Sequence, residues 1–142
     1  NLSIGAKHTA VDYAGSGTIL ASPNGTDLGD IEVHGHLLPA TTFPTFDRLG
    51  LVAENNMYLA WDDGDSQLMM AAAFYAQNEV YSSHQNKIAG TFVGQWFNMG
   101  TDVPSIYQCP DLVGNLPPNL IGGGSNRITL GFDERSWATD FE

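Results

Sequence analysis

Short apolar segments alternate with polar or small residues along this chain of 142 residues, and four of them resemble one another. Each has a small residue, then a bulky pair, then Ala or Gly, at residues 17–21 (GTILA), 50–53 (GLVA), 73–76 (AFYA) and 90–94 (GTFVG). The closing small residues, at positions 21, 53, 76 and 94, are 32, 23 and 18 residues apart, which is the scale of one coil of a β-solenoid. The pattern predicts one ladder across adjacent coils that contains Ile19 or Leu20, then Val52, Tyr75 and Val93, each burying its apolar surface.

Two further sets of short segments follow the first. After a polar break, alternating pairs or triplets occur at residues 31–33, 57–59, 80–81 and 96–97, and a third set occurs at 37–38, 67–71 and 87–89. Three short strands in each unit predict a triangular coil, in which small corner residues let the chain turn without a clash of a β-carbon. Stacked coils bury apolar surface that one coil cannot bury alone. We therefore expect an all-β, single-domain β-solenoid of about four irregular coils.

Two alternatives compete with this interpretation. A β-sandwich also has short strands at regular spacing. Residues 66–82 are rich in helix formers, and Asp65 or Ser66 is suited to cap a helix. The apolar residues at even positions from Leu68 to Ala76 alternate with their neighbours, however, and this alternation favours a strand.

The composition changes after residue 100. Four prolines between positions 104 and 118, and three glycines at 122–124, predict an extended segment over residues 101–126 that acts as a C-terminal cap on the coils of residues 17–100. Residues 127–132 (RITLGF) predict a terminal strand within the last segment, 127–142, suited to cover an open end of the coils.

Charge, hydropathy and cysteine content limit the kinds of partner and covalent link that the protein can have. Sixteen Asp and Glu residues against five Lys and Arg residues give a net charge of −11, which repels phosphate backbones, so we expect no nucleic-acid partner. The longest apolar run, residues 68–76, is about half of the ~18 residues that span a bilayer, so we expect no membrane span. Cys109 is the single cysteine, which excludes an intramolecular disulfide. In a eukaryotic secreted protein, Asn24 would be an N-glycosylation acceptor.

One acidic turn is a candidate metal site. Asp62, Asp63 and Asp65 surround Gly64 with the carboxylate oxygens that Ca²⁺ prefers. The turn lacks the bidentate glutamate that would complete an EF-hand loop. A solvated acidic turn is the commoner origin of such a run, so Ca²⁺ is a possible ligand and no cofactor is required.

Two histidines form a second metal candidate. His34 and His36 are two positions apart, which places both on one face of a strand at a spacing that suits Zn²⁺ or Cu²⁺. Asp30 or Glu32 would have to supply a third ligand. Exposed histidines beside a turn are the commoner explanation of this pattern.

The sequence contains no convincing catalytic centre, and we expect no enzymatic activity. Glycoside hydrolysis needs two facing carboxylates, and candidates are plentiful: Asp27, Asp30, Asp47, Glu54 and Glu79. With sixteen acidic residues, however, some approach one another by chance, and no basic cluster lies near them. A nucleophile elbow and a phosphate-binding loop are both missing from the sequence. The aromatic residues suited to stack on sugar rings are Tyr58, Trp61 and Trp96.

Several sequence segments resemble the C-terminal β-solenoid regions of bacterial pilus-assembly accessory proteins and, more distantly, bactofilin-like polymer-forming coils. The segments are residues 49–53 (LGLVA), 73–76 (AFYA), 88–93 (IAGTFV), 103–107 (VPSIY) and 115–118 (NLPP), so the resemblance covers about residues 17–122. The sequence departs from pilin-like proteins because it lacks their N-terminal hydrophobic helix. The resemblance implies a non-catalytic structural or adhesive module, extracellular or at the cell surface, in a pilus-associated or other filament.

An end of a solenoid exposes the backbone groups of its last strand. We expect Leu2, Ser3 and Ile4 to form such an edge, through which the protein associates with itself or with other surface proteins. The alternative function is a carbohydrate-binding or carbohydrate-cleaving β-helix whose partner is a polysaccharide. The direction in which the aromatic residues point distinguishes the two.

Overall fold

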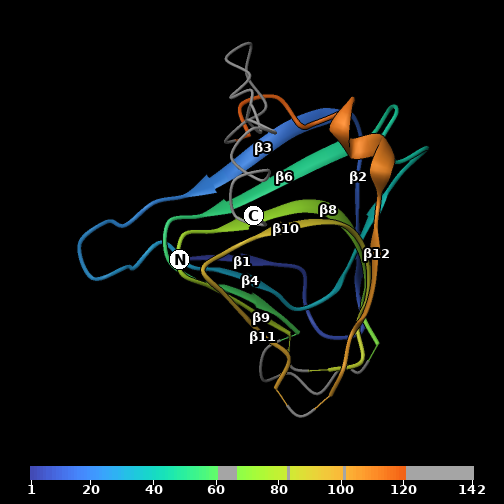
Figure 1. Ribbon diagram of the computed structural model, residues 1–142. Helices are drawn as coiled ribbons and strands as arrows, with labels where there is room; N and C mark the ends of the chain where they lie inside the picture. Colours follow the sequence, from blue (N-terminus) through green and yellow to red (C-terminus); the bar gives the residue numbers. More distant parts are fainter. Residues whose placement is uncertain (61–66, 83, 101, 121–142) are drawn as a thin grey trace, which may run out of the picture.

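The computed structural model describes residues 1–60, 67–82, 84–100 and 102–120. Every pair of named strands in it is parallel, and the strands form two sheets between which the chain moves back and forth. Figure 1 shows the resulting coil, with the strands stacked beside one another. The first sheet, face A, consists of β1 (Leu2–Ile4), β4 (Ile31–Val33), β7 (Met57–Leu59), β9 (Glu79–Ser82) and β11 (Trp96–Asn98).

The second sheet bends so that it supplies the other two faces of the coil. Face B contains β2 (Ala10–Tyr13), β5 (His36–Pro39), β12 (Ser105–Gln108) and the first halves of β8 (Met69–Ala76) and β10 (Lys87–Val93). Face C contains β3 (Ser16–Ala21), β6 (Arg48–Ala53) and the second halves of β8 and β10. The chain therefore visits faces A, B and C in turn, and each circuit is one coil.

This architecture confirms the β-solenoid prediction. Parallel pairing throughout excludes the β-sandwich, which is built from antiparallel strands. Residues 66–82, whose composition also suited a helix, contain β8 and β9. The predicted ladder is confirmed, because the paired neighbours in the register are Leu20 with Val52, Val52 with Tyr75, and Tyr75 with Val93.

The ladder lies on the outer side of face C instead of in the core between the faces, contrary to the expected burial: Val52 and Tyr75 pack in a separate outer cluster with Leu120, and the two end members are exposed. Leu20 and Val93 are 56% and 53% exposed. The core column is formed one position earlier in each strand, where Leu51 and Phe74 are buried and Phe92 stacks on Phe74 at a ring distance of 5.0 Å. Successive side chains of a strand point to opposite sides, so a shift of one residue exchanges core for surface.

The stack of coils extends from Leu2 to Gln108, and its loops differ in length. Residues 22–30, between β3 and β4, extend away from the coil at the left of Figure 1. The segment expected to be an extended cap contributes one more strand, β12, before the short 3-10 helix η1 (Pro110–Val113). No helix among the described residues has the length and apolar character needed to cross a membrane.

After η1 the chain returns along the outside of face C, and we call residues 114–120 the strap. The hydroxyl of Thr18 donates a 2.6 Å hydrogen bond to the carbonyl oxygen of Pro118. Leu120 packs with Val52 and Ala73. Gly50 leaves room for the strap, because a β-carbon at this position would lie 3.1 Å from Leu120 and 2.7 Å from the Thr18 hydroxyl. The proline-rich segment therefore covers a side of the solenoid, and residues 127–132 lie outside the described residues.

Candidate functional site

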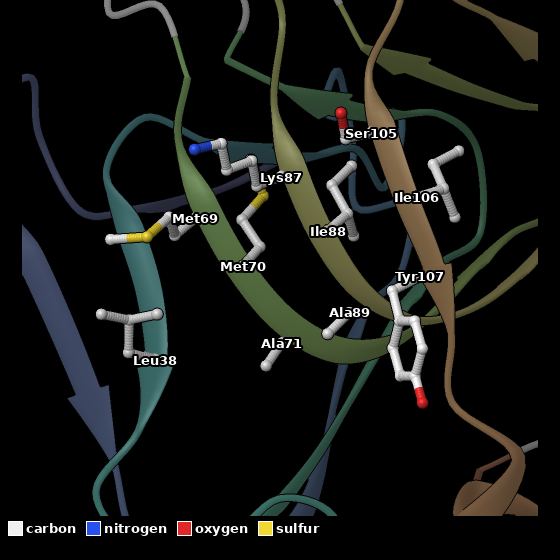
Figure 2. A pocket seen from close by; sticks show the side chains of 10 residues that line it. All are labelled: Leu38, Met69, Met70, Ala71, Lys87, Ile88, Ala89, Ser105, Ile106 and Tyr107. Carbon is white, nitrogen blue, oxygen red and sulfur yellow. The ribbon is translucent and has the colours of Figure 1, made fainter.

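A hollow with a volume of about 550 Å³ lies on face B. Figure 2 shows its lining side chains, which come from four neighbouring strands, β5, β8, β10 and β12. The register places Ala71 beside Ala89 and Ala89 beside Tyr107. Leu38 follows Leu37, which pairs with Met70, so Leu38 lies opposite Ala71. We call this hollow the face B groove.

Small residues create the groove. The methyl groups of Ala71 and Ala89 form a low floor, while Leu38 and Tyr107 rise at its two ends. Met69 and Lys87 lie along one side, and the ammonium group of Lys87 is the single cationic group in the lining. An apolar surface with one charged group has the composition of a ligand site, and its volume lies within the usual range of about 300–1,000 Å³.

Sequence analysis did not identify the face B groove. The sequence carried a signal for the groove in the segments 37–38, 67–71 and 87–89. Their outward residues Leu38, Ala71 and Ala89 are apolar instead of polar. The alternation that marks a strand with one solvated face therefore fails on face B.

The predicted aromatic residues lie on face A. Tyr58, on β7, shares a column with Tyr81 on β9, and their ring centroids are 6.4 Å apart at a tilt of 54°. The side-chain amide of Asn56 donates a 3.1 Å hydrogen bond to the Tyr58 hydroxyl. Partial burial raises the pKa of the Tyr58 phenol, and the carboxylates of Asp30, Glu79 and Glu32 raise it further, while the Asn56 hydrogen bond lowers it.

Trp96 begins β11, two strands from Tyr58, and is 69% exposed. It pairs in register with Glu79 and lines a hollow of about 480 Å³ together with Asn98 and Met99. An exposed indole beside a carboxylate and an amide is a chemically suitable stacking surface for a sugar ring. Trp61 lies outside the described residues.

The two predicted histidines take part in separate interactions. The Nδ1 atom of His36 accepts a 2.9 Å hydrogen bond from the backbone N–H of Met69, at the start of β8. The Nε2 atom of His34 lies 3.2 Å from a carboxylate oxygen of Glu32. In the part of the chain that the structure describes, no three His, Cys, Asp or Glu side chains are grouped to hold a metal ion. Asp62, Asp63 and Asp65 lie outside that part.

Two carboxylates considered for catalysis bind backbone and side-chain donors. Asp47 is buried and accepts hydrogen bonds from the backbone N–H of Gly15 at 2.6 Å and from the Thr41 hydroxyl at 2.7 Å, which joins the first two coils. Asp30 is buried and accepts hydrogen bonds from the Asn55 side-chain amide at 2.7 Å and the Asn56 backbone at 3.0 Å. Both groups therefore stabilise corners of the coil.

The corner before face A carries a ladder of amide and carboxyl side chains that sequence analysis missed. Asp30 binds Asn55 and Asn56, and the Asn56 side chain accepts a 2.8 Å hydrogen bond from the side chain of Asn78 in the next coil. The sequence carried a signal for this ladder: an Asn or Asp stands one or two residues before the segments 31–33, 57–59 and 80–81. Such ladders satisfy backbone donors at a corner where strand pairing is interrupted.

Asn86, at the corner before β10, was also missed. Its side chain is fully buried and donates to the carbonyl oxygen of Leu59 at 3.3 Å and to the hydroxyl of Ser82 at 2.9 Å. Its Oδ1 atom accepts a 3.1 Å hydrogen bond from the backbone N–H of Leu68. One amide thus joins two neighbouring coils.

The predicted assembly edge lies in β1, the terminal strand of face A. Leu2 and Ile4 pack against the core, whereas Ser3 is exposed. Among the described strands, β4 is the one that pairs with β1.

Comparison of this chain with protein-family models, with curated proteins and with solved structures finds no match. The functional conclusion below therefore depends on the geometry of the solenoid.

Proposed function

We propose that this protein is a non-catalytic structural module of an extracellular or cell-surface assembly, in which copies stack through the ends of their solenoids. The observation that carries the proposal is the loss of burial at the last coil. Val80 is 1% exposed, but Phe97, its partner in the next strand, is 41% exposed. Ile88 is 2% exposed, but its partner Ile106 is 44% exposed.

These two pairs show what a further coil would contribute. Within a column, each core side chain is covered by the equivalent side chain of the next coil, and the described residues supply none beyond Phe97 and Ile106. At the other end, Leu2 and Val11 begin the same two columns. A second copy stacked head to tail would continue both columns with inward residues of its own first coil, whichever of its faces lies over each column. Such a contact joins different surfaces of the two copies, so it propagates into a filament unless the rotation closes a ring.

The resemblance to pilus-associated and polymer-forming solenoids agrees with this proposal. Parallel coils suit assembly because an added copy continues an existing pattern of backbone hydrogen bonds. The net charge of −11 opposes contact between copies in general, so the apolar surface that stacking covers at Phe97 and Ile106 has to outweigh this repulsion.

Sedimentation velocity and light scattering over a concentration series test this proposal. We expect the mean mass to rise with concentration for the unmodified chain, and to rise much less for Phe97→Ser and Ile106→Ser. Phe46→Ser is the matched control, because Phe46 is 69% exposed but lies in the loop between β5 and β6. Thermal melting must show that each variant is folded. A chain that is monomeric at all concentrations would contradict the assembly function.

Carbohydrate binding is the second candidate, and the outward position of Tyr58 and Trp96 on face A favours it. Affinity electrophoresis in gels that contain polysaccharides is the direct test. Binding that is retained by Phe46→Ser and lost in Trp96→Ala would support this function, whereas equal mobility in every gel would exclude it for the polysaccharides tested.

A further inference from the structure

In the part of the chain that the structure describes, the last coil has no strand on face C. Strand β12 follows β10 as far as Gln108, and the backbone N–H of Cys109 donates to the carbonyl oxygen of Gly90 at 3.2 Å. The chain then turns into η1, so in the described residues no strand lies beyond residues 91–93 of β10. Among the described residues, faces A and B have a strand in the fifth coil and face C has none, and we call the place beside residues 91–93 of β10 the vacant position.

Hollows border this vacant position. One, of about 200 Å³, is lined by residues that include Thr91, Phe92 and Ile106. Another, of about 490 Å³, lies toward η1 and the strap and is lined by residues that include Leu112 and Leu116. A strand placed here would have apolar side chains on both of its sides, as a buried strand requires.

The backbone of β10 offers hydrogen-bonding groups on this side. Asn86 and Gly90 accept hydrogen bonds from β12 and the residue after it, at Ser105 and Cys109. Backbone groups alternate in direction along a strand, so the N–H and C=O of Phe92 also point toward the vacant position.

The first strand of the chain has complementary groups. Leu2 donates its N–H to Asp30, and Ile4 accepts a hydrogen bond from His34, so both residues direct backbone groups toward β4. By the same alternation, the N–H and C=O of Ser3 point away from β4, to the edge of β1 that pairs with no described strand.

We infer that the vacant position beside residues 91–93 receives β1 of a second copy, parallel to β10. This inference rests on the proposed function. A coil is continued without a gap only when the first added strand takes the first vacant position, which is on face C. The second copy is therefore rotated by one face relative to the first.

One alignment of β1 of the second copy against β10 lets the backbone groups of both strands face each other and keeps apolar side chains inside the coil. In this register Ser3 lies opposite Val93. The Ser3 N–H then donates to the Phe92 carbonyl oxygen, the Gly94 N–H donates to the Ser3 carbonyl oxygen, and Leu2 covers Phe92 inside the coil. Placing Ser3 opposite Thr91 would require the carbonyl oxygen of Gly90, which already accepts from Cys109.

Disulfide trapping between two variants tests this register. Ser3→Cys and Val93→Cys are made separately in a Cys109→Ser background, mixed, and oxidised gently. A bridge within one chain is excluded, because Cys109 is the single cysteine of the sequence and each variant chain therefore carries one thiol. We expect a disulfide-linked heterodimer that contains one of each variant.

The control replaces Val93→Cys by Asn98→Cys. Ser3 and Asn98 are the first and last outward residues of the face A column, so this pair would react if copies stacked without rotation. Association with trapping by Asn98→Cys, or by neither variant, would overturn the register and leave the assembly function standing. If a segment of the same chain filled the vacant position, Val93→Cys would not react with Ser3→Cys, and this result would also overturn the inferred register.

Proline at Ser3 is an independent test. The Ser3 N–H is not used in pairing with β4, so Ser3→Pro removes the donor to the second copy and leaves the β1–β4 hydrogen bonds of Leu2 and Ile4 in place. We expect at least tenfold weaker association with an unchanged melting temperature, and no weakening for Ser3→Ala. If a folded Ser3→Pro chain associates as strongly as the unmodified chain, the inference is overturned. If the unmodified chain is monomeric, the proposed assembly function itself is contradicted.

Discussion

The hydroxyl of Tyr13 donates a 2.6 Å hydrogen bond to the carbonyl oxygen of Ala71, 58 residues later in the chain. Leu37 pairs with Met70, so Pro39 follows opposite Ala72, where a residue with an N–H would donate to the Ala71 carbonyl oxygen. Proline has no N–H to donate. Tyr13 pairs with Pro39 in the adjacent strand and supplies the missing donor from there.

Tyr13→Phe should therefore lower the free energy of unfolding by about 1–3 kcal/mol, because it leaves the carbonyl oxygen of Ala71 without a donor in a partly buried position. Urea unfolding at neutral pH measures the loss. Tyr107→Phe is the matched control, because Tyr107 is 66% exposed. Equal midpoints for the two variants would contradict this role of Tyr13.

Tyr13 also predicts a loss of stability in alkali. Burial, and then the negative charge of Asp47, raise the pKa of the Tyr13 phenol above its ordinary value of about 10. The folded state therefore holds this proton more tightly than the unfolded state, so the contribution is complete below about pH 10 and is lost as the pH rises above it. Unfolding midpoints between pH 8 and 11.5 should fall more steeply for the unmodified chain than for Tyr13→Phe. Parallel curves would refute this.

Asp47 predicts the opposite dependence in acid. The Thr41 hydroxyl, and then the Gly15 N–H, lower the pKa of the Asp47 carboxyl, and burial only partly opposes them. The contribution of Asp47 is thus present above the ordinary carboxyl pKa of about 4 and is lost as the pH falls below it. Asp47→Asn should lower the melting temperature at pH 7 by several degrees and flatten the decline below pH 4. Asp12→Asn, at an exposed position, should do neither.

Asn86→Ala should destabilise the protein by at least about 2 kcal/mol, because it leaves buried groups of Leu59, Leu68 and Ser82 without a partner. Asn86→Asp retains the acceptor for Leu68 but loses both donors, so it should not restore stability. Chemical denaturation provides the comparison, with the exposed neighbour variant Gln85→Ala as control. A loss no larger than that of the control would show that the amide is dispensable.

Gly90→Ala should cost more than about 3 kcal/mol or prevent folding. Gly90 has a φ of 156°, and a β-carbon there would lie 1.8 Å from the Ala72 carbonyl oxygen. Gly17→Ala is the control, because a β-carbon at Gly17 meets no atom within 4 Å, and its effect should stay within about 1 kcal/mol. Circular dichroism and thermal melting of both variants check the difference, and a stable Gly90→Ala would mean that the corner is built differently.

The sequence by itself determined the strand pattern and most of the register. The small residues that close the repeated phrases at Ala21, Ala53 and Ala76 align in the sheet, because the phrases repeat the same alternation and parallel strands pair like with like. The second and third sets of segments likewise became faces A and B. Local alternation is sufficient to predict the strand pairing, since each coil contacts chiefly the coils directly before and after it.

The tertiary structure decided which side of each strand is the core. Leu20 and Ile19 are both apolar, so alternation alone did not distinguish the core column from the surface column, and the outward ladder was assigned to the core. The strap resolved part of this ambiguity, because it buries Val52 on the outer side of face C.

The candidate sites depended still more on tertiary structure. The face B groove brings Leu38 and Tyr107 to one hollow, and the hollows beside the vacant position bring residues of β10, β12 and the strap together. These residues meet through the stacking of the coils. The structural roles of Asn86, Asp47 and Tyr13 were missed for the same reason, since each side chain bonds to backbone groups whose position follows from the winding of the coil. A sequence shows which residues alternate, but the pitch and corners of the coil determine which of them meet.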